Sequence, residues 1–144
     1  MSHTSTVDAV VVTDVEALKS AVRELNSAGV KCGILENATP RAFYATQKGM
    51  GEAPYVIKLD DAKYDIGVYK KADNSGYEFR TDFYGGSVQA VLGAAGGPPN
   101  NLGKLCQMYA VHAVTRKAAQ QGMSVSRVPN SNGGIKLVIN DNRA

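Results

Sequence analysis

The stretch that decides the fold is YDIGVYKKADNSGYEFRTDFY, residues 64–84. Apolar and polar residues alternate over 64–69 and again over 77–84, and the turn-forming residues 73–76 separate the two runs. Successive side chains on a strand point to opposite faces. The pattern therefore predicts an antiparallel hairpin whose aromatic residues face a core while Glu78, Arg80 and Asp82 face water.

The residues before this hairpin predict a strand, a helix and further strands. The β-branched run at 7–12 favours a buried strand, and Thr13 with Glu16 has the spacing of a capping box that begins a helix ending near Gly29. Lys19 and Arg23 lie on the polar side of that helix. Strand-like segments follow at 31–35, 41–44 and 55–59, with 47–54 as a loop.

The residues after the hairpin begin with a glycine- and proline-rich stretch, 85–103, which holds six of the 15 glycines. We expect a flexible loop at about 85–100, within which Val88, Val91 and Leu92 allow a short helical turn. A second helix then runs from a cap at Asn100 or Asn101 to Gln121. The segments 123–127 and 135–139 predict a terminal hairpin.

Together these elements predict one α+β domain over residues 1–144. We expect a mainly antiparallel sheet with the helices 14–28 and 101–121 on one face, as a ferredoxin-like variant with added β-hairpins. A chain of 144 residues suits a single hydrophobic core. Sheet edges left by the hairpins offer pairing sites for a second copy.

Composition excludes several classes of protein. The chain is 44% hydrophobic and 20% charged, which is too apolar and too balanced in charge for disorder. It has no apolar run of roughly 18 residues, as a membrane span needs, and no secretory signal at its start. Two cysteines, Cys32 and Cys106, exclude a disulfide framework but not a single bridge. We therefore expect a reducing cytoplasm.

Charge is distributed unevenly along the chain. Residues 1–99 carry ten Lys and Arg against twelve Asp and Glu, a net of −2, whereas residues 100–144 carry six against one, a net of +5. Scattered cations of this kind are usually solvated surface, but they also suit phosphate contacts. With Tyr69 and Tyr84 as rings for base stacking, the candidate binding residues are Lys104, Arg116, Lys117, Arg127, Lys136, Tyr69 and Tyr84.

The sequence shows no complete catalytic or metal-binding pattern. Its histidines are His3, near the start, and His112, inside the second helix, where helix packing is the simpler interpretation. Cys106 lies six residues before His112, on another face of that helix. The glycines of 93–97 lack the ending of a phosphate loop. The carboxylate grouping is Asp60, Asp61 and Asp65 with Asp82, of which Asp60, Asp65 and Asp82 would serve a metal-dependent enzyme. We expect no catalytic residues, no metal and no cofactor.

Several segments in this order resemble a known family. They are Met1-Ser2-His3, Tyr64-Asp65-Ile66-Gly67, Gly76-Tyr77-Glu78, Thr81 to Gly85, Leu105 to Ala110, Ala118 to Val125 and Gly133 to Leu137. The chain is similar to a family of small proteins with no assigned activity, found in cyanobacteria, in red-algal plastids as a hypothetical chloroplast reading frame, and in bacteriophages. The resemblance implies an accessory role and supplies no catalytic residues.

Two functional hypotheses remain. The first is a non-enzymatic accessory or assembly protein that acts through protein–protein contacts, with self-association into a homo-oligomer. The alternative is a nucleotide- or RNA-binding module that uses the basic final third. No membrane partner is expected.

Overall fold

A strand and a helix are followed by four consecutive strands, a helical segment and a terminal hairpin. The computed structural model describes residues 4–41, 51–94, 101–129, 131 and 134–141. Its elements are β1 (Thr4–Val12), α1 (Val15–Ser27), β2 (Cys32–Ala38), β3 (Ala53–Leu59), β4 (Ile66–Lys70), β5 (Tyr77–Asp82), a 3₁₀ turn (Tyr84–Gly86), α2 (Ser87–Leu92), α3 (Gly103–Gln120), β6 (Met123–Pro129) and β7 (Ile135–Asp141).

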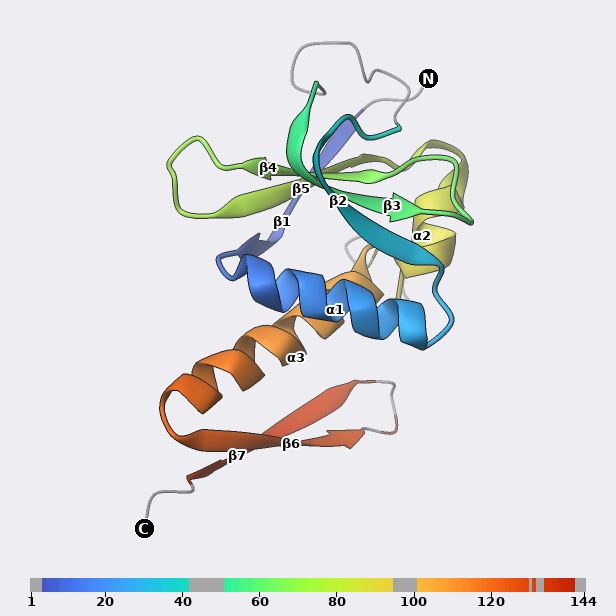
Figure 1. The fold of residues 1–144 in the computed structure, drawn as a ribbon. Coiled ribbons are helices and arrows are strands. Elements are labelled where there is room, and N and C mark those ends of the chain that lie inside the picture. The colour runs from blue at the N-terminus through green and yellow to red at the C-terminus, as the bar shows by residue number, and fades with distance from the viewer. Residues whose placement is uncertain (1–3, 42–50, 95–100, 130, 132–133, 142–144) are drawn as a thin grey trace.

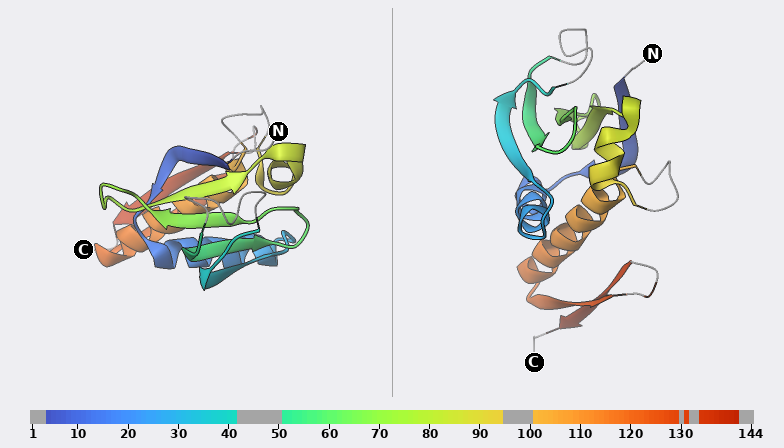
Figure 2. Two further views of the ribbon diagram at one scale, coloured as in Figure 1. Left: turned by 90° about the horizontal axis from the view of Figure 1, so that it is seen from above. Right: turned by 90° about the vertical axis from the view of Figure 1, so that its right-hand side faces the viewer.

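Two antiparallel sheets lie on opposite sides of a helical layer. The main sheet has five strands in the order β1-β5-β4-β3-β2, and β6 and β7 form a second, two-stranded sheet among the described residues. Figure 1 shows the main sheet above, α1 and α3 beneath it, and the β6–β7 hairpin on the far side of α3; the right-hand view of Figure 2 shows the same three layers. The hairpin is therefore separated from the main sheet by the helices.

The hydrophobic core lies between the main sheet and the helices. Its largest fully buried side chains include Phe79 from β5, Ile57 from β3, Leu18 from α1 and Leu105 from α3. In α1 the buried residues recur at three and four positions, as an amphipathic helix packed on a sheet requires: Ala17, Leu18, Ala21, Val22 and Leu25. None of the described helices is both long and apolar enough to cross a membrane.

The predicted fold class is confirmed. The chain is a single α+β domain with a mainly antiparallel sheet, and both hairpins lie where the alternation placed them. The short helical turn expected around Val88 is α2. The ferredoxin-like comparison stays a prediction, because β6 and β7 form a sheet of their own. The strand expected at 41–44 and the rest of the glycine-rich loop, 95–100, lie outside the described residues.

Both helix starts differ from the prediction. The N-cap of α1 is Asp14, whose carboxylate accepts a hydrogen bond from Ala17 N at 3.1 Å, whereas Thr13 had been expected in that position. Aspartate is the better cap of the two neighbours, since its carboxylate also suits the positive end of the helix dipole. Helix α3 begins after Leu102, with no side-chain cap, so the predicted capping role of Asn101 is wrong.

Asp82 is also not where the alternation placed it. It was expected to face water but is 1% exposed, because β5 ends there and the carboxylate turns back to accept a hydrogen bond from Tyr84 N at 2.9 Å. An aspartate that accepts from the backbone two residues ahead is typical of a turn. Asp82 thus fixes the exit of β5 into the 3₁₀ turn.

On the sheet face away from α1, Gly67 and Tyr69 make a close pair. Residues two apart on a strand share a face, and the Tyr69 ring lies so close to Gly67 that a methyl group there would overlap it. The Arg80 guanidinium covers the ring at 4.6 Å from its centroid, and the Tyr69 hydroxyl donates to Gly51 O at 2.9 Å. Gly67 is therefore required by its neighbour's side chain.

Replacing Gly67 by alanine should displace the Tyr69 ring. We expect Gly67→Ala to lower the free energy of unfolding by about 1–3 kcal/mol, the usual cost of overpacking. Gly33→Ala on the edge strand β2 is the matched control, because an added methyl group meets nothing within 4 Å there. Urea unfolding of both variants tests this, and equal stabilities would contradict the close contact.

Candidate functional site

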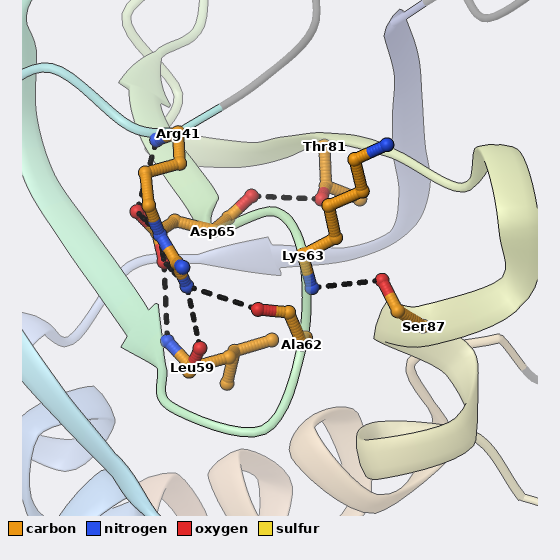
Figure 3. A network of polar contacts seen from close by, with 7 residues as sticks. All are labelled: Arg41, Leu59, Ala62, Lys63, Asp65, Thr81 and Ser87. Carbon is orange, nitrogen blue, oxygen red and sulfur yellow. Dashed lines mark hydrogen bonds and ion pairs between the residues drawn. The ribbon is translucent and has the colours of Figure 1, made fainter.

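The most extensive polar network in the described chain joins Arg41 to Asp65 (Figure 3). The Arg41 side chain donates to the Asp65 carboxylate through Nε at 3.1 Å and Nη2 at 2.8 Å, and Arg41 N donates to the same carboxylate at 2.9 Å. Nη2 also reaches the carbonyl oxygens of Leu59 and Ala62. Leu59 N completes the set by donating to Asp65 Oδ1 at 3.2 Å.

This network is structural. Thr81 Oγ1 on β5 donates to Asp65 O at 2.8 Å, and Lys63 N donates to Ser87 Oγ at 2.9 Å, so it ties the β3–β4 connection to β5 and α2. Both oxygens of Asp65 already accept hydrogen bonds, and its side chain is 6% exposed. A saturated, buried carboxylate is poorly placed to act as a general base.

The predicted basic residues lie on three different elements, α3, β6 and β7. Arg116 Nε donates to Asp14 Oδ2 at 2.9 Å, and Arg127 makes a two-pronged ion pair with Glu24 at 2.7 and 3.0 Å. Lys104, Lys117 and Lys136 are exposed. The two arginines therefore stabilise contacts between elements, and the five cations do not form one patch.

The two tyrosines predicted to stack on bases differ in their exposure. Tyr84 is 56% exposed, as expected. Tyr69 is 9% exposed beneath Arg80, so its predicted role as an exposed stacking ring is wrong. Burial raises the pKa of the Tyr69 hydroxyl, against a smaller opposing effect of Arg80.

A groove of about 620 Å³ opens between the start of α1 and the second half of α3. One wall consists of residues 13–16 and Lys19, at the start of α1 and just before it, together with Tyr55 of β3. The other wall comes from α3: Ala113, Val114, Arg116, Lys117 and Gln120. Its volume falls within the range of about 300–1,000 Å³ that small-ligand sites occupy. Only Arg116 and Lys117 of the predicted site residues contribute to it.

Opposite charges line this groove. Burial raises the pKa of Asp14, but the hydrogen bond from Ala17 N and the contacts with Arg116 outweigh it, so the pKa lies below its usual value. Lys19 Nζ lies 5.7 Å from the centroid of the Tyr55 ring and 4.0 Å from Glu16. Lys117 makes no ion pair within the described part of the chain. Lys117 is thus available to a ligand.

Beside Lys117 lies a smaller and more apolar hollow, of about 230 Å³, between α3 and the terminal hairpin. Val114 and Lys117 line this hollow as well as the groove. Ala118 of α3, Met123 of β6 and Ile139 of β7 supply its apolar surface, and Ile139 is 53% exposed. Neither hollow could be predicted from local sequence patterns, because the walls come from separate elements. The groove lies between segments about 100 residues apart, and the smaller hollow lies between α3 and the hairpin that follows it.

Glu24 of α1 joins three elements. Its carboxylate lies 2.7 Å from His112 Nε2 on α3 and also pairs with Arg127 on β6. These contacts, that of Arg127 first, hold the pKa of Glu24 below its usual value even though burial raises it. His112 is thus a packing residue with a polar partner, and the hairpin is fastened to α1 through Arg127.

The described residues contain no cluster of three or more His, Cys, Asp or Glu side chains able to hold a metal ion. Asp65 is bound by Arg41 and Asp82 by Tyr84 N, while Asp60 is exposed. Cys32 and Cys106 are free and half-buried, and burial raises the pKa of both thiols.

Comparison with known proteins gives one match. The family described as "Protein of unknown function (DUF1257)" matches residues 30–138, which spans the main sheet from β2 onward, α3 and most of the terminal hairpin. No curated protein and no solved structure matches the chain.

The Arg41–Asp65 pair should matter for stability. Arg41→Ala leaves a buried carboxylate without its cation, and we expect the free energy of unfolding to fall by about 3 kcal/mol. Arg23→Ala is the matched control, because the Arg23 side chain is exposed and its one hydrogen bond to a described residue is to Ser20; its effect should stay within about 0.5 kcal/mol. Chemical unfolding measures both, and similar small losses would show that the network contributes little.

The contacts of Glu24 should make stability depend on pH. A carboxylate whose pKa is lowered by folding stabilises the fold above its unfolded pKa of about 4.3, and that contribution is lost as the pH falls further. Wild type should therefore be more stable than Glu24→Gln at pH 7, and the difference should shrink at pH 3. Thermal unfolding at both pH values tests this, with Glu52→Gln at an exposed site as control. A difference that is the same at both pH values would contradict it.

Proposed function

The chain belongs to the DUF1257 family of proteins of unknown function, and we propose that it is a non-enzymatic accessory or assembly protein that acts through protein–protein contacts. Its contact surface is the β6–β7 hairpin, and its first partner is a second copy of the chain. The resemblance to plastid, cyanobacterial and phage proteins supports a place in the cytoplasm of a bacterium or a phage-infected host.

The observation that carries the proposal is the incomplete burial of this hairpin. None of the described residues of β6 and β7 is buried, and none belongs to the hydrophobic core. A two-stranded hairpin is at best marginally stable by itself, whereas three or more strands support one another. The hairpin therefore gains from further strands.

The outer face of the hairpin offers apolar contacts. Arg127 pairs in register with Leu137 and reaches Glu24, so that face points toward the helices. Side chains alternate along each strand, which places Val128 and Val138 on the outer face, where they are 44% and 37% exposed. Apolar residues on an unpaired edge are a template for strand pairing.

A second copy suits this surface best. Within the described residues β6 and β7 pair only with each other, so each keeps an open edge. A two-fold contact joins the same surface from both copies, and dimers of this kind are the commonest oligomers. Antiparallel pairing of two hairpins would give a four-stranded sheet with the valines of both copies on one face.

The nucleotide- or RNA-binding alternative has less support. Arg116 and Arg127 are engaged with carboxylates, and Tyr69 is buried. Exposed lysines and Tyr84 remain for such a role, but they lie on different elements. Stacking of bases needs an exposed aromatic platform beside the cations.

Mutation of the outer face should abolish self-association. We expect wild type to elute as a dimer and Val128→Glu and Val138→Glu to elute as monomers, because each places a carboxylate in an apolar contact. The measurement is mass by light scattering after size exclusion.

Leu35→Glu, on the edge strand β2 of the main sheet, is the matched control and should stay dimeric. A wild-type protein that is monomeric at every accessible concentration would overturn self-association. A dimer that survives both valine variants would move the interface elsewhere.

A further inference from the structure

The two hollows beside α3 are adjacent and together make one candidate binding surface. They share Val114 and Lys117, and the residues of α3 and its C-cap that line them extend from Ala113 to Gln121. Eight residues of helix rise over roughly 12 Å, which is the length of about four extended residues. The surface is therefore long enough for a short peptide segment.

One end of this surface is polar and has an excess of positive charge. Lys19, Arg116 and Lys117 lie there with Asp14 and Glu16. Arg116 engages Asp14 through Nε alone, and its Nη nitrogens make no hydrogen bond within the described residues. Arg116 and Lys117 are thus placed to bind a carboxylate, which a guanidinium recognises with two parallel hydrogen bonds.

The other end is apolar. Val114, Ala118, Met123 and Ile139 surround the smaller hollow, and Lys117 lines both this hollow and the charged groove. Aliphatic walls of this kind accept an aliphatic side chain, and the half-exposed Ile139 would become covered when one is bound.

We propose that this surface binds a short extended segment of a partner protein that carries one aliphatic residue next to acidic residues. The aliphatic side chain enters the hollow beside Ile139, and a carboxylate pairs with Lys117 and Arg116. This contact is distinct from self-association. The peptide uses the inner face of the hairpin, and self-association uses the outer face.

A nucleic acid suits the same surface less well. The ring of Tyr55 is the aromatic group that lines it, and one face of this ring is covered by Lys19 while Tyr77 packs edge-on at 5.8 Å between centroids. The carboxylate of Glu16 would also repel phosphates. Stacking, on which single-strand binding depends, has no free platform here.

The experiment measures fluorescence anisotropy of fluorescein-labelled peptides Glu-Glu-Asp-Leu-Leu and Leu-Leu-Asp-Glu-Glu, which cover both chain directions. Comparison probes are Leu-Leu-Lys-Lys-Lys and a five-nucleotide uridine RNA. We expect one acidic peptide to bind, more weakly as salt rises, and neither comparison probe to bind.

Two variants test the two ends of the surface, and both change exposed side chains. Lys117→Glu should weaken the acidic peptide about tenfold through like-charge repulsion, and Ile139→Asp should weaken it by a similar factor. Lys104→Glu is the matched control, with the same charge change at an exposed site near the start of α3 that lines neither hollow, and should bind as wild type does.

Three outcomes would overturn the proposal: neither acidic peptide binds, Lys117→Glu and Lys104→Glu weaken binding equally, or the RNA binds and Lys117→Glu abolishes that binding. The mass of Lys117→Glu in solution separates the two proposals. If Lys117→Glu stays dimeric but no longer binds peptide, both proposals are supported. If the wild type is dimeric but binds no peptide, the peptide proposal fails and self-association stands.

Discussion

The packing of α1 against α3 is the contact on which the rest of the structure depends. Helix α1 buries one side against the main sheet, and α3 crosses its other side as the second part of the helical layer (Figure 1). The Tyr109 hydroxyl on α3 accepts hydrogen bonds from Thr13 N at 3.0 Å and Asp14 N at 3.2 Å, where β1 passes into α1. Further along, His112 meets Glu24. The contacts of Tyr109 just before α1 and of His112 near the end of α1 thus fix the direction of α3. Helix α3 in turn positions the hairpin.

These contacts explain the uneven charge along the sequence. The acidic part of the chain contains Asp14 and Glu24, and the basic part contains Arg116 and Arg127, so part of the opposite charge of the two segments is neutralised within the molecule. Arg116 and Arg127, two of the six cations of the final third, thus connect α3 and the hairpin to α1. Exposed lysines remain for ligands, and Lys117 among them lines both hollows.

The sequence predicted the parts of the fold that depend on local patterns. Alternation over 64–84 identified β4 and β5, and apolar residues at three and four positions identified α1. It did not place Asp82, whose burial depends on the turn after β5, or Tyr69, whose ring fits over Gly67. A glycine two positions before a tyrosine on one strand is the local signal that was missed. The groove had no such signal, because the contact between Asp14 and Arg116 spans 102 residues.

The terminal hairpin connects this folding argument with function. Its strands bury no side chain fully, and ion pairs at half-exposed sites, such as that of Arg127 with Glu24, add little stability in water. An element with few buried contacts opens and closes more readily than the core does, so its packing responds to whatever covers it. A strand of a second copy paired at an open edge, with its valines beside Val128 and Val138, and a peptide beside Ile139 on the inner face would each add the apolar burial that the hairpin lacks.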